Sequence, residues 1–150
     1  MRPFLRTVLS TVAGLITALL LLIAVEGFSA VVHPVPEGFG STPEEMCQHV
    51  ANYPPWVLAV VVPMWGGIAF LSVWLTAKIG NLISAGIVGT LFMAAVIANI
   101  MMLPYPSWFS IACPLVTSIA VVMAVRLNYR RSPTGQAVGN TGSDVRSEFE

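Results

Sequence analysis

Residues 7–32 read TVLSTVAGLITALLLLIAVEGFSAVV, an apolar run whose single charged residue is Glu26. A helix needs about 20 mainly apolar residues to cross the hydrocarbon core of a bilayer. Lipid offers no hydrogen-bond partner to the backbone, so a spanning segment must be a helix or part of a closed barrel. Because the run is continuous and does not alternate between apolar and polar positions, it predicts a membrane-spanning helix.

Three further runs of the same kind follow, at residues 56–77, 82–103 and 107–127. The chain has 150 residues, of which 56% are hydrophobic and only 9% are charged, whereas an average soluble domain carries roughly 25% charged residues. We therefore expect an all-α fold, an integral membrane four-helix bundle formed by residues 1–131. Residues 132–150 are small and polar, which predicts a disordered cytoplasmic tail.

The first run has a competing interpretation as a cleaved signal peptide. The apolar core of a signal peptide is usually about 7–15 residues long. The run before Glu26 is longer than this, so a retained membrane anchor is expected.

The basic residues fall on one side of the predicted bundle. Cytoplasmic loops collect Lys and Arg, but the 35–55 and 104–106 connections contain neither residue. Both termini are therefore predicted to be cytoplasmic, in the plasma (bacterial inner) membrane, with the 33–55 loop outside. The basic residues that flank the predicted spans on the inner side are Arg2, Arg6, Lys78, Arg126, Arg130 and Arg131.

The outer loop contains the signals of a short helix over residues 43–52. Thr42 is a suitable N-cap, Pro43 suits the first helical position, and Glu45 completes a Thr-x-x-Glu capping box. We expect this extracytoplasmic helix to lie on the membrane surface or across the mouth of the bundle.

Four residues are predicted to form a polar layer below the outer surface: Glu26, Asn99, Ser110 and Cys113. At 1.5 Å per helical residue, Glu26, Asn99 and Cys113 lie about 7–9 Å below the outer ends of their spans. An ionisable residue inside a span is a candidate functional group. The alternative is an interfacial side chain that simply reaches toward water.

Small residues recur at four-residue spacing on two of the predicted spans, where they let helix backbones approach closely. We expect these ridges to pack the four helices together, and joining two copies of the chain is the alternative. The residues are Ser10, Gly14 and Ala18 on the first span, and Gly86, Thr90, Ala94 and Ala98 on the third.

Other kinds of site receive little support. The possible metal ligands of the outer loop match no standard zinc spacing, so no metal and no cofactor is predicted; they are Cys47, His49, His33, Glu44 and Glu45. Whether Cys47 pairs with Cys113 is left open, since both fall on the oxidising side. No catalytic constellation or nucleic-acid-binding surface is apparent.

The stretch MMLPYPSWFSIA at residues 101–112, together with the Glu26 region, resembles a group of small four-helix bacterial membrane proteins without an assigned function. This resemblance implies the four-helix fold and says nothing about an activity. The sequence favours a non-enzymatic accessory or structural membrane component, whose partners are the lipid bilayer and either a second copy or another membrane protein. The alternative is a small proton- or cation-coupled transporter that uses Glu26.

Overall fold

The computed structural model describes residues 2–129, so the predicted tail at 132–150 lies outside the described residues, as do Arg130 and Arg131. The described part is all helical, and its helices are α1 (Arg2–Val32), α2 (Pro43–Ala51), α3 (Pro55–Ile79), α4 (Leu82–Met102) and α5 (Ser107–Tyr129). Four of them are long and apolar enough to cross a membrane. The prediction of an all-α fold is therefore confirmed for the described residues, and the four long apolar helices support the predicted multi-pass membrane protein.

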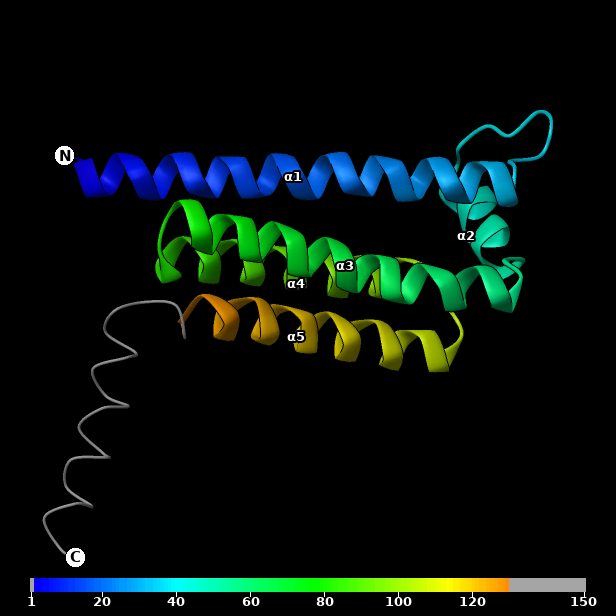
Figure 1. The fold of residues 1–150 in the computed structure, drawn as a ribbon. Coiled ribbons are helices and arrows are strands. Elements are labelled where there is room, and N and C mark those ends of the chain that lie inside the picture. Colours follow the sequence, from blue (N-terminus) through cyan, green and yellow to red (C-terminus); the bar gives the residue numbers. More distant parts are fainter. Residues whose placement is uncertain (1, 130–150) are drawn as a thin grey trace, which may run out of the picture.

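The four long helices lie side by side, and α2 lies at one end of them, close to the end of α1 and the start of α3 (Figure 1). The beginning of α1 and the end of α5 lie at the opposite end. Helix α3 packs against α1, α4 and α5, and 56% of its most apolar window is buried, against 22–28% in the other three. Helix α3 is thus the central helix.

Contact between α1 and its neighbours runs along the small residues of α1. Ser10, Gly14 and Ala18 are buried, and α1 packs against both α3 and α4. A Cβ atom added at Gly14 would collide with Oγ1 of Thr76 on α3. The absence of a side chain at Gly14 therefore sets how closely α1 and α3 approach.

The ridge predicted on α4 behaves differently. Its four residues, Gly86, Thr90, Ala94 and Ala98, are all exposed, and a Cβ at Gly86 would meet nothing within 4 Å. The buried face consists of Ser84, Ala85, Val88, Gly89, Phe92 and Val96. The expectation that the predicted ridge packs the four helices together is wrong for α4, because the adjacent face, with the small residues Ala85 and Gly89, is the one that packs: a Cβ at Gly89 would lie 3.0 Å from Cγ1 of Val121 on α5.

The end of the bundle opposite α2 is held by polar contacts that the sequence analysis missed. Arg6 Nε donates to the carbonyl oxygen of Ile79 at 2.8 Å, and Asn81 Nδ2 donates to Thr7 Oγ1 at 2.7 Å. Asn81 also caps α4, since its Oδ1 accepts from the Ser84 backbone N–H at 2.9 Å. These contacts join the start of α1 to the turn between α3 and α4.

Candidate functional site

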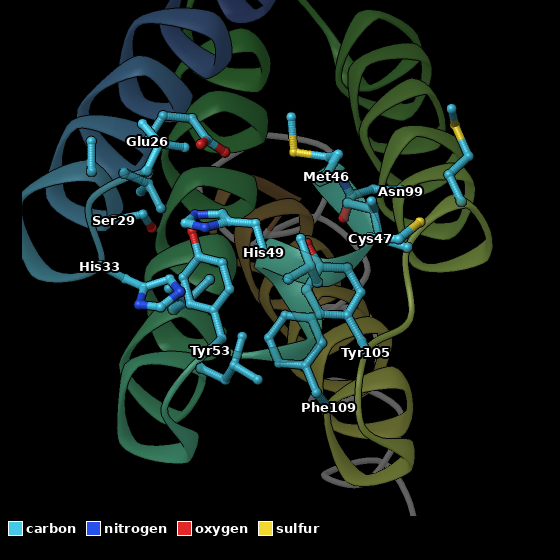
Figure 2. Close-up of a pocket in the computed structure, with 18 of the residues that line it drawn as sticks. Glu26, Ser29, His33, Met46, Cys47, His49, Tyr53, Asn99, Tyr105 and Phe109 are labelled. Atoms are coloured by element: carbon cyan, nitrogen blue, oxygen red, sulfur yellow. The ribbon is translucent and has the colours of Figure 1, made fainter. Parts of the chain in front are cut away.

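A pocket of about 630 Å³ lies at the α2 end of the bundle, and all five helices contribute to its wall (Figure 2). Pockets that bind drug-sized molecules usually have volumes of about 300–1,000 Å³ and mainly apolar walls with a few polar groups. The apolar wall includes Val25, Leu58, Val61, Trp65 and Phe109. Trp65 lies about 15 Å along the helix axis from the start of α3, so the pocket reaches into the membrane-spanning part.

Two members of the predicted polar layer lie on this wall. Glu26 comes from α1, and in Figure 2 its carboxylate points into the pocket. Asn99 comes from α4 on the other side of the pocket. The Oδ1 atom of Asn99 is buried and has no hydrogen-bond partner among the described residues. A buried acceptor without a partner costs about 1–3 kcal/mol, so a hydrogen-bond donor bound here would be stabilised.

The other two members of the layer are not part of the pocket wall, which corrects the predicted four-residue layer. Cys113 is fully buried in the apolar core of the bundle, and the hydroxyl of Ser110 donates to the carbonyl oxygen of Pro106 at 3.3 Å. The rotation of α5 points Cys113 into the core.

Two histidines and a tyrosine form a ring cluster where α1, α2 and the start of α3 meet. The ring centroids of His33 and His49 are 4.5 Å apart and stacked, and Tyr53 lies 4.6 Å from His33. Burial lowers the pKa of His49, and the nearby His33 lowers it further because two positive charges would repel. The His33 Nε2 atom is buried without a hydrogen-bond partner among residues 2–129.

Burial and the nearby Glu26 both affect the pKa of two tyrosines in the pocket wall. Burial raises the pKa of Tyr53, contact with the Ser29 hydroxyl opposes this rise, and the carboxylate of Glu26 adds to it. Burial and then the same carboxylate raise the pKa of Tyr105. Both phenols therefore stay protonated at neutral pH and can donate hydrogen bonds inside the pocket.

Helix α2 supplies one side of the pocket. Its N-terminus has both hydrogen bonds of a capping box: the Glu45 backbone N–H donates to Thr42 Oγ1 at 3.3 Å, and the Thr42 N–H donates to Glu45 Oε2 at 3.1 Å. The second bond is also the main reason why the pKa of Glu45 is lowered. Met46, Cys47 and Val50 then line the pocket.

A smaller cavity of about 300 Å³ lies beside the connection between α1 and α2 and shares His33 and His49 with the main pocket. Glu37 and Glu45 also line it. Within residues 2–129, no three His, Cys, Asp or Glu side chains gather in a group that could hold a metal ion. Cys47 and Cys113 are both free.

The sequence analysis missed four aromatic residues of the pocket wall: Tyr53, Trp65, Tyr105 and Phe109. Tyr53 and Tyr105 carry one usable signal, since each precedes a span and is followed by proline. Aromatic residues at such positions are common interfacial anchors, so this signal does not separate a binding residue from an anchor.

Comparison with models of known protein families, with curated proteins and with solved structures finds no match to the chain. The resemblance drawn from residues 101–112 therefore stays a prediction. The pocket itself provides the basis for a functional hypothesis.

Proposed function

We propose that this chain is a non-enzymatic accessory protein of the plasma membrane, which binds a small molecule in the pocket that its five helices line. The observation that carries the proposal is the pocket itself. Its volume of about 630 Å³ and its apolar wall with convergent polar side chains are typical of small-molecule sites. The free Cys113, the strongest nucleophile of the predicted polar layer, is fully buried away from the pocket wall, which favours binding over covalent chemistry.

The proposed orientation has both termini in the cytoplasm and the pocket at the extracytoplasmic side. Arg6 and Lys78 support it, because both lie at the end of the bundle opposite α2: Arg6 contacts Ile79, the last residue of α3. Basic residues favour the cytoplasmic side. The pocket then faces the outside of the cell.

The exposed face of α4 supports the accessory role. Gly86, Thr90, Ala94 and Ala98 leave a shallow surface onto which another membrane helix can pack closely. The proposed occupant is a helix of a second copy or of another membrane protein. Native mass spectrometry of the full chain in nanodiscs would measure how many copies of the chain and of any partner form the complex.

A small proton- or cation-coupled carrier is the second candidate, because Glu26 lies on the pocket wall. Such a carrier must also open toward the cytoplasm. At that end α1 contacts α3 closely at Gly14, and Ser10, Thr76 and Ser84 are fully buried with their hydroxyls bonded to backbone carbonyls. A loss of transport or of a pH response in Glu26→Gln, with assembly intact, would favour the carrier.

The binding proposal is tested with 1-aminoanthracene, an uncharged fluorescent probe of apolar sites, added to the full chain in nanodiscs. We expect saturable binding that exceeds the signal from empty nanodiscs. Ala30→Trp should abolish it, because Ala30 lines the pocket and the indole would occupy part of its volume. Ala24→Trp is the matched control, since Ala24 is exposed on the same helix but lies outside the pocket wall. Equal binding by both variants would contradict the proposal.

A further inference from the structure

We propose that the molecule taken by this pocket is a hydrophobic amine, with an apolar body and one protonated amino group, held by the carboxylate of Glu26. The inference rests on the proposed binding function and specifies its ligand class. Its basis is the unequal distribution of charge and of hydrogen-bond acceptors around the pocket.

The pocket wall carries a negative charge without a permanent positive one. Glu26 points into the pocket, and among residues 2–129 no Lys or Arg lines it. Glu26 is an exposed residue on this wall, and a carboxylate forms its strongest hydrogen bonds with positively charged donors. An anionic ligand would instead meet like charge at Glu26, so charge complementarity selects a cation.

Asn99 adds a second acceptor from another helix. Its buried Oδ1 lacks a hydrogen-bond partner among the described residues, and Asn99 lines the same pocket as Glu26. An ammonium group carries several N–H donors and no acceptor, which matches two acceptors on the wall. A ligand without N–H or O–H groups would leave Oδ1 unsatisfied.

The remaining wall suits the rest of such a molecule. The rings of Tyr53, Trp65, Tyr105 and Phe109 line the pocket, and aromatic faces attract cations as well as apolar groups. His49 is compatible with a cationic ligand at neutral pH, because burial and then repulsion from His33 lower its pKa. An alkyl chain or ring system then fills the apolar part between Val25, Leu58 and Val61.

The test compares two molecules of the same chain length, dodecylamine and 1-dodecanol, as competitors that displace 1-aminoanthracene from the full chain in nanodiscs at pH 7.5. The amine is charged at this pH because alkyl ammonium groups have pKa values near that of Lys, about 10.4. A charge-assisted hydrogen bond should strengthen binding of the amine. The concentration needed for half-displacement should therefore be at least roughly tenfold lower for the amine than for the alcohol.

Three variants assign this preference to the site. Glu26→Gln should make the two half-displacement concentrations similar, whereas Glu26→Asp should keep most of the preference for the amine. Glu44→Gln, which removes an exposed carboxylate on α2 outside the pocket wall, should leave it unchanged and corrects for attraction of amines to any acidic protein.

The possible failures are distinct. Saturable probe binding with equal displacement by the amine and the alcohol in the wild-type chain would overturn the amine inference and leave the binding function standing. A preference that persists in Glu26→Gln would also overturn it, because another group would then recognise the charge. Absence of saturable probe binding would contradict the proposed binding function itself.

Discussion

Gly14 shows how one residue controls the approach of two helices. Its position on α1 has no room for a side chain, because Oγ1 of Thr76 occupies the place where a Cβ would be. Thr76 has little freedom to move away: it is fully buried, and its hydroxyl donates to the carbonyl oxygen of Ser72 at 2.7 Å. In a lipid environment, close backbone approach of this kind supplies much of the packing energy between helices.

We therefore predict that Gly14→Ala lowers the free energy of unfolding by about 1–3 kcal/mol, the usual cost of overpacking a close contact. Gly27→Ala is the matched control on the same helix, since a Cβ there meets nothing within 4 Å. It should not lower stability and should raise it by up to about 1 kcal/mol, because Ala is the better helix former. Denaturant titration in mild detergent measures both, and equal stability of the two variants would contradict the packing argument.

Helix α2 is the element that is held least firmly. It spans Pro43–Ala51 and buries one side chain, Val50. Its other attachment is the ring cluster, in which His49 lies against His33 and Tyr53. Elements with little buried apolar surface open more easily than the core. Since α2 lines the pocket, we expect that loss of the ring contacts of His49 would let α2 move and would change access to the pocket.

Acidification should loosen α2. The pKa of His49 is lowered in the folded protein, by burial first and by His33 second, and the unfolded segment titrates near 6.5. The opened state therefore binds more protons, so the stabilisation is complete above about pH 6.5 and falls as the pH drops below it.

Hydrogen exchange of the α2 amides, corrected for the intrinsic rate at each pH, measures this effect. Protection should decrease between about pH 7.5 and pH 5.5, on both sides of the unfolded pKa. His49→Gln should remove most of the change. An unchanged pH response in that variant would show that another group controls the docking of α2.

At the scale of the whole molecule, basic residues lie at the end of the bundle opposite the pocket. Arg6 lies near the start of α1 and Lys78 lies in the last turn of α3. Lys78 Nζ is 4.8 Å from the ring centroid of Trp74. The outer loop between α1 and α3 carries Glu37, Glu44 and Glu45 without any Lys or Arg. This asymmetry predicts a single orientation in the membrane.

Labelling with a membrane-impermeant thiol reagent tests the orientation in intact cells that produce a Cys47→Ser background. Glu37→Cys should react from outside, because Glu37 is exposed on the loop before α2. Lys78→Cys, which is exposed at the other end, should react only after the membrane is permeabilised. The opposite pattern would place the pocket on the cytoplasmic side.

Local sequence determined the elements of this protein. The four spans follow from apolar runs of membrane-crossing length. Helix α2 starts at Pro43, after Thr42 and with Glu45 at the capping position, as the sequence predicted. These features depend on residues that are neighbours along the chain, so they can be predicted without knowing what packs against what.

Only the tertiary structure decided how each helix is rotated. A span that is apolar on all sides contains no amphipathic pattern to mark its buried face, so the choice depends on how side chains of different helices fit together. That choice placed Gly86 outside and Ala85 inside on α4, and it directed Cys113 into the core while Asn99 remained on the pocket wall. The pairing of His33 with His49 likewise depends on how α2 folds back against the end of α1, which no local pattern specifies.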